Sequence, residues 1–186
     1  MKEIAEQFGD FENFDKKEFL EKTAGLEGYL FPDTYLFLPG AETEQIIGTM
    51  RDNFQKKAGD VGQDTVIMAS LIEKEVPDSD DRKIVSGILW KRLEIGMPLQ
   101  VDAVFPYITG RQKVLSDDLK IDSLYNTYFY KGLPPGPISN PGLDAIEAAR
   151  NPKESPYLYY LSGRDGKTHF AKTFAEHLKN KEKYLK

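Results

Sequence analysis

The amino-acid sequence predicts an α+β fold in which helices are mixed with short β-hairpins, together with a small N-terminal portion of helix and strand. Two observations support this class. Apolar residues recur at helical spacing in several segments, whereas other segments are rich in aromatic residues and bounded by glycine or proline, as strands and turns are. The two kinds of segment follow one another without the regular strand–helix alternation of a parallel sheet, so a parallel α/β fold is not expected.

The composition limits the classes of function. Of the 186 residues, 40% are hydrophobic and 30% are charged, which is the balance of a globular protein. The formal net charge is -5 and the basic residues are scattered, so nucleic acid is not expected as a partner. The chain has no cysteine, which excludes disulfides, thiolate zinc sites and cysteine nucleophiles.

The first forty residues are predicted to hold two short helices and one extended stretch. Residues 2–8 and about 15–24 have helical patterns, and Asp15 with Glu18 has the spacing of a capping box. Residues 26–38 are dense in aromatic residues and bounded by glycine and proline, which predicts strand and turn.

Three amphipathic helices are predicted next. The first covers residues 43–57, where apolar side chains share one face. The second covers residues 64–76, with Asp64 as its N-cap and Pro77 as the residue that stops it. The third covers residues 79–95.

The C-terminal part of the chain is predicted to be mixed. Residues 99–105 are expected to be extended, and residues 116–140 to be mostly irregular. A short helix is expected over about residues 140–150, because proline is tolerated in the first turn of a helix. Residues 157–171 have the pattern of a β-hairpin, and a last helix is predicted for about residues 174–185.

The inventory of reactive side chains favours carboxylate chemistry. The sequence contains two histidines and no cysteine, so no metal site is expected. It also lacks a glycine-rich phosphate loop and a Gly-x-Ser-x-Gly nucleophile elbow, and no cofactor is expected.

Glu75 is the carboxylate with the most informative position. At about 100° per residue, it falls on the same broad apolar face as Leu71 and Ile72, whereas Glu73 falls at the margin of that face. Apolar neighbours disfavour an ionised carboxylate and raise its pKa, as a glycosidic general acid requires. The alternative is a helix-end glutamate that bends to solvent, and from the pattern alone this is the commoner case.

Two further segments could line a binding groove. Residues 122–128 offer tyrosine rings for sugar faces and paired donors and acceptors, and the proline-rich residues 132–141 form a stiff wall beside them. Gln100 and Asp102 would face the same side of an extended segment. A packed surface loop and a solvated polar face explain these two patterns equally well.

Several motifs occur in a fixed order. They read Leu-Glu-Gly-Tyr-Leu-Phe-Pro-Asp-Thr-Tyr at residues 26–35, Ala-Ser-Leu-Ile-Glu-Lys-Glu at 69–75, Lys-Arg-Leu through Leu-Gln-Val-Asp at 91–102, Tyr-Asn-Thr-Tyr at 125–128, Gly-Leu-Pro-Pro-Gly-Pro-Ile at 132–138, Asn-Pro-Gly at 140–142 and Tyr-Leu-Tyr-Tyr at 157–160. With His169, Phe170 and His177, this order resembles the MltG/YceG-like family of endolytic peptidoglycan transglycosylases over about residues 26–180.

The resemblance implies a lysozyme-like catalytic cleft in residues 26–186, preceded by a helical segment, residues 1–25, that links it to an upstream module. It implies that Glu75, the second glutamate of the Glu-Lys-Glu motif, is the catalytic acid and base. The residues expected to bind substrate are Glu73, Gln100, Asp102, Tyr125, Asn126, Thr127, Tyr128, Leu133 and Pro134.

The resemblance also implies partners and a location. The substrate would be the glycan strands of peptidoglycan, cut without water to give 1,6-anhydro ends that terminate strand elongation. Penicillin-binding proteins would be partners, and a membrane anchor upstream of residue 1 would hold the chain at the extracytoplasmic face of the bacterial cell membrane.

Two other functions stay open at this point. A lysozyme-like hydrolase would use Glu75 with an auxiliary carboxylate such as Asp102 or Glu73, because hydrolysis by a glycosidase ordinarily needs two carboxyl groups. A non-catalytic module that binds glycan or scaffolds the cell-wall machinery would not need Glu75 for chemistry.

Overall fold

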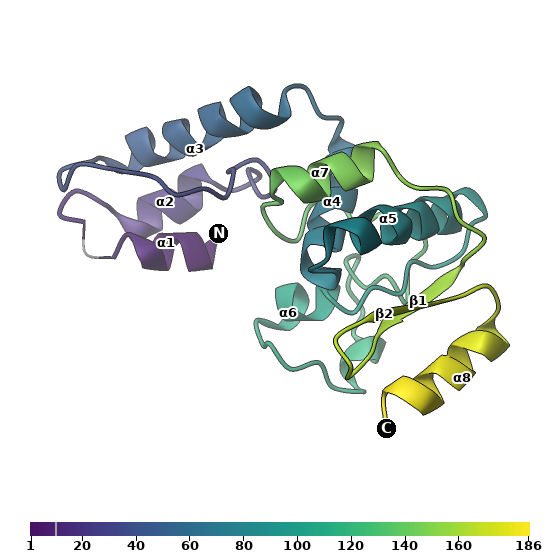
Figure 1. Ribbon diagram of the computed structural model, residues 1–186. Helices are drawn as coiled ribbons and strands as arrows, with labels where there is room; N and C mark the ends of the chain where they lie inside the picture. The colour runs from purple at the N-terminus through teal and green to yellow at the C-terminus, as the bar shows by residue number, and fades with distance from the viewer. Residues whose placement is uncertain (10) are drawn as a thin grey trace.

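A computed structural model describes residues 1–9 and 11–186, and within them helices predominate over one two-stranded sheet (Figure 1). In chain order the elements are α1 (Lys2–Gln7), α2 (Lys16–Lys22), α3 (Thr43–Ala58), α4 (Gln63–Glu75), α5 (Ser79–Glu94), α6 (Val104–Thr109), the 3₁₀ helix η1 (Asp118–Lys120), α7 (Leu143–Arg150), β1 (Tyr159–Ser162), β2 (Thr168–Ala171) and α8 (Phe174–Tyr184). The predicted α+β class is confirmed, and so are the helices expected at residues 43–57, 79–95 and 174–185.

Helix α4 is the centre of the main hydrophobic core. Its residues 66–72 are all buried, so the helix is enclosed on every side rather than along one stripe. Helices α5 and α7 pack against it, and Figure 1 shows both beside it. Full burial of one leucine or isoleucine side chain is worth about 2 kcal/mol. The helix is therefore held firmly as far as its last turn, where Glu75 lies.

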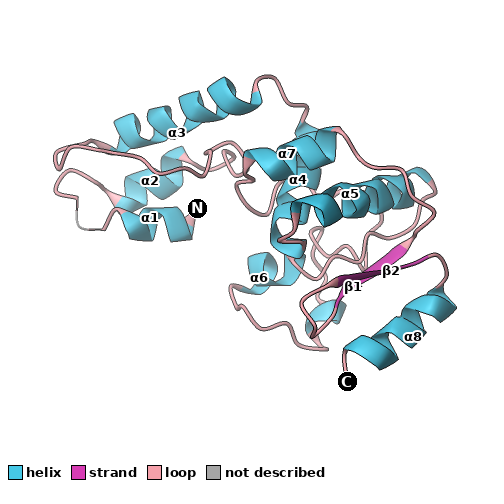
Figure 2. Ribbon diagram, viewed as in Figure 1, coloured by secondary structure: helices cyan, strands magenta, loops and turns pink. Residues whose placement is uncertain are grey.

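The first three helices enclose a second hydrophobic cluster. Its buried residues include Phe19, Leu30, Ile46 and Met50. Figure 2 shows α1, α2 and α3 grouped on one side of the molecule and the remaining helices on the other. The domain boundary expected at residue 25 stays a prediction, and this cluster draws side chains from both sides of it.

Gly28 and Asn140 join the two clusters. The side-chain oxygen of Asn140 accepts the backbone N–H groups of Gly28 and Leu30, at 2.8 and 3.0 Å. Gly28 has a φ of 93°, and a Cβ atom there would lie 2.6 Å from Pro137 and 2.7 Å from Val66. Only glycine therefore allows the chain to pass this close to α4.

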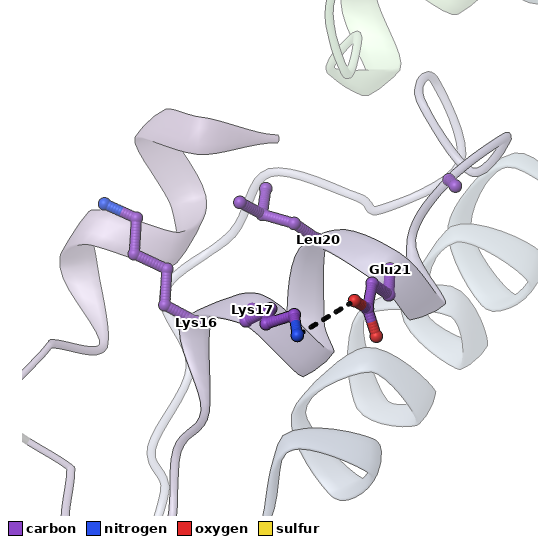
Figure 3. Close-up of a pocket in the computed structure, with 5 residues that line it drawn as sticks. Lys16, Lys17, Leu20 and Glu21 are labelled. Carbon is purple, nitrogen blue, oxygen red and sulfur yellow. Dashed lines mark ion pairs between the residues drawn. The ribbon is translucent and has the colours of Figure 1, made fainter.

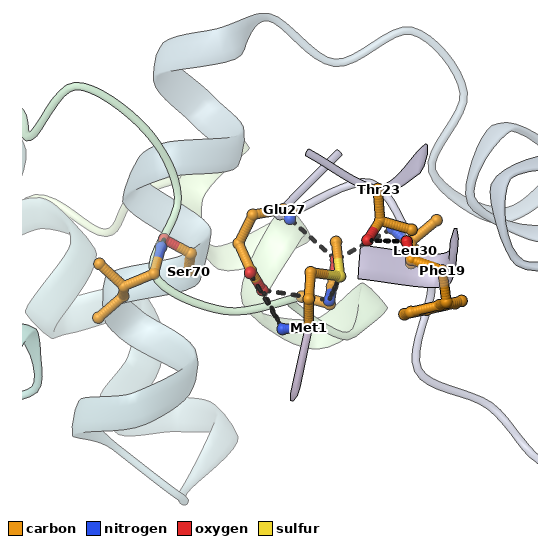
Figure 4. Close-up of polar contacts among 9 residues, drawn as sticks. Met1, Phe19, Thr23, Glu27, Leu30 and Ser70 are labelled. Atoms are coloured by element: carbon orange, nitrogen blue, oxygen red, sulfur yellow. Dashed lines mark hydrogen bonds and ion pairs between the residues drawn. The ribbon is translucent and has the colours of Figure 1, made fainter. Parts of the chain in front are cut away.

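Two buried polar contacts fix the neighbouring loop. The Ser70 hydroxyl accepts the N–H of Ile138 at 3.0 Å, and the Ser70 carbonyl accepts the Ser139 hydroxyl at 3.0 Å. Glu27 accepts hydrogen bonds from Asn140, at 3.3 Å, and from the amino group of Met1, at 3.1 Å. Figure 4 shows Ser70 on its helix and the ion pair between Glu27 and Met1. The proline-rich loop is thus tied to α4.

The C-terminal hairpin confirms the pattern predicted for residues 157–171. Strands β1 and β2 are antiparallel, with Tyr160 opposite Phe170 and Leu161 opposite His169. Helix α8 packs on this hairpin and begins with a capping box between Thr173 and Glu176. In the part of the chain that the structure describes, no helix combines the length and the apolar character needed to cross a membrane.

Residues 26–38 were expected to form strand and turn. A turn is present at residues 27–28, but the prediction of a strand is wrong. These residues run without regular secondary structure, and no described strand lies alongside them to complete a ladder. Their backbone donors are satisfied in other ways, by the side chain of Asn140 and, for Phe31, by the carbonyl of Met50 at 3.2 Å. The aromatic side chains pack on the helices instead of on a sheet.

Three smaller expectations about element ends also need correction. The N-cap of α4 is Gly62 and not Asp64. Asp15 caps α2 through its side chain, but its own N–H donates to Thr43, so the reciprocal bond of a capping box is replaced. Residues 99–105 are not extended to their end, because α6 begins at Val104.

Candidate active site

Glu75 is the last residue of α4, and each of its carboxyl oxygens has a hydrogen-bond donor. The N–H of Ala103 donates to Oε1 at 3.0 Å, and the hydroxyl of Tyr160 donates to Oε2 at 3.2 Å. The next residue, Val76, is extended, so the helix ends here and the chain turns away before Pro77. Glu75 as a whole residue keeps partial exposure.

The pKa of Glu75 is raised from 4.5 to about 6, mainly by burial and also by the negative charge of Asp102. The hydrogen bonds from Ala103 and Tyr160 act in the opposite direction, because they favour the ionised form. Burial is the largest of these effects, so the group holds its proton to a higher pH than an ordinary glutamate does. The raised pKa predicted for Glu75 is confirmed, with burial as its main cause, and a carboxyl group with such a pKa is suited to acid–base chemistry.

The loop that carries Ala103 is anchored to Thr127. Gln100 donates its N–H to the Thr127 carbonyl at 3.1 Å, and Val101 donates to the Thr127 hydroxyl at 2.9 Å. Gln100 has a φ of 52°, a left-handed conformation that costs a non-glycine residue about 1 kcal/mol. The buried contacts of Thr127 hold this conformation, and the next turn then presents the N–H of Ala103 to Glu75.

Gln100 and Asp102 are exposed on either side of buried Val101. The extended segment predicted to place them on one side is interrupted, because Gln100 is left-handed and Asp102 lies in a turn. The Tyr128 hydroxyl donates to Asp102 at 2.5 Å, and the Tyr128 ring packs on Phe105 with ring centres 5.8 Å apart. Burial and the charge of Asp102 raise the pKa of Tyr128 well above its usual value, so its hydroxyl stays protonated. The structure therefore brings Asp102 and Tyr128 together beside Glu75.

Asn126 and Thr127 were expected to contact substrate, and the structure places them elsewhere. Asn126 is 0% exposed and Thr127 is 2% exposed. The Asn126 side chain donates to the carbonyls of Leu119 and Ile121 and accepts the N–H of Tyr128. The polar groups of these two residues form hydrogen bonds within the protein. Both side chains therefore support the loop and are not exposed on its surface.

Glu73 also has a structural role. Its Oε1 pairs with Arg82 at 3.3 Å, and its Oε2 accepts the N–H of Gly142 at 3.0 Å. Arg82 in turn donates to the carbonyl of Val76 at 2.7 Å and pairs with Asp144 at 2.9 Å. This network holds the end of α4 against α5 and the start of α7, so Glu73 supports the helix end that carries Glu75.

The remaining predicted substrate contacts lie on the proline-rich side. The ring of Tyr125 packs against that of Tyr107, with centres 4.9 Å apart, and both are partly exposed. Leu133 is partly buried against the main core, and Pro134 is buried. No hydrogen bond or ring contact among the described residues joins these side chains to Glu75, so their role as substrate contacts stays a prediction.

Sequence reasoning missed two residues of the site, Tyr160 and Arg92. Arg92 is 4% exposed, donates to the carbonyls of Leu158 and Leu99, and lies over the Tyr159 ring. It thereby ties α5 to the hairpin that carries Tyr160. The sequence predicted the hairpin of residues 157–171, but a strand pattern does not reveal which distant carboxylate a tyrosine contacts.

Two open depressions lie away from Glu75. One is on α2, lined by Lys16, Lys17, Leu20, Glu21 and Ala24, and Figure 3 shows the ion pair between Lys17 and Glu21 beside it. The other lies between α5 and residues 152–155. Within residues 1–9 and 11–186, no three histidine, aspartate or glutamate side chains lie close enough to hold a metal ion.

The structure thus defines an α+β protein built on one enclosed helix that ends in a glutamate with a raised pKa. Residues 1–183 match the model of the YceG-like family. The chain belongs to the YceG-like family.

Named relatives agree with this membership. The chain is 42% identical over 174 residues to the endolytic murein transglycosylase of Bacillus subtilis strain 168, covering 86% of this chain and 48% of the relative. It is 34% identical over 173 residues to the endolytic murein transglycosylase of Streptococcus pneumoniae D39, covering 83% of this chain and 31% of the relative. The chain therefore spans about half or less of the length of these relatives.

A solved structure has the same fold. The crystal structure of a YceG-like protein from Listeria monocytogenes superposes with a TM-score of 0.76 at 37% sequence identity. The match covers 95% of this chain and 62% of the other.

Proposed function

We propose that this chain is the catalytic part of an endolytic peptidoglycan lytic transglycosylase and that Glu75 is its acid and base. The observation that carries the proposal is the carboxyl group of Glu75, partly buried, with a pKa raised to about 6 and one hydrogen-bond donor on each oxygen. The names of the Bacillus and Streptococcus relatives support the reaction class.

The first step is protonation of the leaving group. Glu75 in its neutral form donates its proton to the glycosidic oxygen between N-acetylmuramic acid and N-acetylglucosamine. The bond from that oxygen to the anomeric carbon breaks, and positive charge develops on the sugar ring. Glu75 is left as a carboxylate, which the donors Ala103 and Tyr160 stabilise.

The second step closes a ring within the substrate. The C6 hydroxyl of the muramic acid attacks its own anomeric carbon, and its proton passes to the Glu75 carboxylate. The product is a 1,6-anhydro sugar, no water is consumed, and Glu75 returns to its neutral form. Intramolecular attack has a large effective-molarity advantage, so a second catalytic carboxylate is not required.

The exposed groups near Glu75 form the proposed glycan contacts. Gln100 and Asp102 offer polar groups to sugar hydroxyls and acetamido groups, and the partly exposed ring of Tyr128 lies beside them. Tyr125 with Leu133 forms the more distant wall of the proposed cleft. Glu73, Asn126 and Thr127 support this surface and are not included among the contacts.

The proposed function also implies a location and partners for the chain. Peptidoglycan lies outside the cytoplasmic membrane, so we propose that the chain works at the extracytoplasmic face, where cutting nascent strands terminates their elongation. An anchor on a longer form of the protein and partnership with penicillin-binding proteins follow from the family resemblance and belong to the same proposal.

The test is the chemistry of the cut ends. Purified chain is incubated with peptidoglycan, and the products are analysed by mass spectrometry beside those of Glu75→Gln. We expect 1,6-anhydromuramic acid ends with the wild type and none with the variant, which must retain its folded circular-dichroism spectrum. Reducing muramic acid ends without anhydro ends would overturn the lytic mechanism.

A hydrolase is the second candidate, because Asp102 lies close enough to Glu75 to raise its pKa. In that reading, Asp102 would be the second carboxylate that attacks or activates water. Its bond from Tyr128 occupies one oxygen and leaves the other available. Glu73 is not a candidate for this role, because both of its oxygens are engaged with Arg82 and Gly142.

A further inference from the structure

Two different kinds of donor hold the carboxyl group of Glu75. On Oε1 the donor is the backbone N–H of Ala103, which can donate a hydrogen bond but cannot accept one. On Oε2 the donor is the hydroxyl of Tyr160, which can do both. Oε1 therefore has a fixed partner, whereas the partner of Oε2 can adjust when the carboxyl group gains or loses a proton.

Tyr160 keeps the proton that this role needs. It lies on β1, and burial together with the charge of Glu75 raises its pKa well above its usual value. Its hydroxyl therefore stays protonated where Glu75 titrates. The ring is held by the strand pairing of Tyr160 with Phe170 and by the contacts of the hairpin with α8.

We infer that Tyr160 is a positioning residue for Glu75, whose hydroxyl orients the carboxyl group and stabilises the carboxylate left behind by proton donation. This inference rests on the proposed function of Glu75. Among the described residues, Tyr160 is the side chain that hydrogen-bonds to Glu75. The other charged or titratable groups near Glu75 in the described residues are Asp102, Tyr128 and Arg92, and none of their side chains hydrogen-bonds to Glu75. The Asp102 charge raises the pKa of Glu75 through space, whereas the Asp102 backbone N–H acts in the opposite direction.

The direct test is the titration of Glu75 in the free protein. Carbon-13-labelled glutamate gives one carboxyl signal per glutamate in NMR spectra, and the signal lost in Glu75→Gln identifies Glu75. Removing the Tyr160 hydroxyl by Tyr160→Phe destabilises the ionised form, so we expect the midpoint to rise by about one pH unit.

Tyr159→Phe is the matched control. It removes the same atom from the neighbouring residue of β1, whose ring packs against Phe174 and His177. The midpoint of Glu75 is expected to stay at the wild-type value in this variant. An unchanged midpoint in Tyr160→Phe, or an equal shift in both variants, would overturn the inference.

The cleavage rate gives the second measurement. In Tyr160→Phe the high-pH limb of kcat is expected to move to higher pH, because Glu75 keeps its proton longer. The maximal kcat falls about tenfold, because the carboxylate formed is less stable. A purely structural role would lower kcat without moving the limb, and that result would also overturn the inference. If the wild type does not cleave glycan, the proposed function fails, whereas the NMR midpoint still tests the contact.

A stronger donor at the same position covers the case in which Tyr160→Phe does not fold. 3,5-Difluorotyrosine incorporated at residue 160 keeps the ring and the hydroxyl but donates more strongly. The Glu75 midpoint is then expected to fall below the wild-type value. A midpoint that does not fall would contradict a hydrogen bond that favours the ionised form.

Discussion

The backbone N–H of Ala103 donates a hydrogen bond to Oε1 of Glu75 over 3.0 Å. This contact joins the end of α4 to the turn that precedes α6. Hydrogen bonds from Gln100 and Val101 to Thr127 hold that turn in place. The acid–base group and the loop that orients it are thus supplied by separate parts of the chain.

The first prediction concerns stability and pH. The pKa of Glu75 is raised by folding from 4.5 to about 6, so its contribution to stability is complete below pH 4.5 and is lost as the pH rises through about 6. The loss is about 2 kcal/mol. Glu75→Gln cannot ionise, so its free energy of unfolding relative to the wild type is expected to rise by about 2 kcal/mol between pH 4 and pH 7. Urea unfolding at both pH values measures this, and a difference that does not change with pH would contradict it.

The second prediction concerns Asp102→Asn. The negative charge of Asp102 raises the pKa of Glu75, so its removal lowers that pKa. The high-pH limb of the cleavage rate should then move to lower pH, with activity retained at acidic pH. Rate profiles of the two proteins check this.

Asp122→Asn is the control for this measurement. Asp122 accepts a hydrogen bond from Tyr130 at 2.7 Å, the same kind of pair as Asp102 with Tyr128, and it is not among the groups that shift the pKa of Glu75. Its profile is expected to match the wild type. Complete loss of cleavage in Asp102→Asn at every pH would instead favour the hydrolase.

The sequence predicted the helices well where the pattern is strong, because α3, α5 and α8 are long and have clear starts. It also predicted the raised pKa of Glu75, because the spacing of residues along a single helix decides which face a side chain occupies. The failures share a different cause. Whether residues 26–38 form a strand depends on a pairing partner far along the chain, and no local pattern contains that information.

The same limit applies to the site. Asn126 and Tyr128 are two residues apart in a motif rich in polar and aromatic residues, yet one is fully buried and the other is partly exposed. Irregular loops lack the periodicity that separates buried from exposed positions. The residue types alone therefore could not distinguish a side chain that supports the loop from one that is available to a ligand. Tyr160 was missed for a related reason, since its partner lies 85 residues away.

The third prediction concerns the junction at Gly28. Gly28→Ala places a methyl group against Pro137 and Val66 in a left-handed backbone, so both strain and overlap destabilise the fold. We expect a loss of about 3 kcal/mol in the free energy of unfolding. Gly25→Ala is the matched control, because Gly25 has a φ of 86° and nothing within 4 Å of an added Cβ. It should lose only about 1 kcal/mol. Equal losses of unfolding free energy in the two variants would show that the close packing at Gly28 does not contribute to the destabilisation.

The last prediction separates support from contact at Asn126. Asn126→Ala removes three hydrogen bonds from a fully buried side chain and leaves the carbonyls of Leu119 and Ile121 without that donor. We expect a loss of about 3 kcal/mol in stability, measured by urea unfolding. Asn151→Ala, at an exposed asparagine that bonds to Glu147, should change stability by less than about 0.5 kcal/mol.

The kinetics of Asn126→Ala complete this comparison. If the residue only supports the loop, the protein that remains folded at low temperature should bind glycan with a KM close to the wild-type value. A large rise in KM with unchanged stability would place the Asn126 side chain in contact with substrate. Because Asn126 is 0% exposed, that outcome would require the loop of residues 121–130 to open when glycan binds.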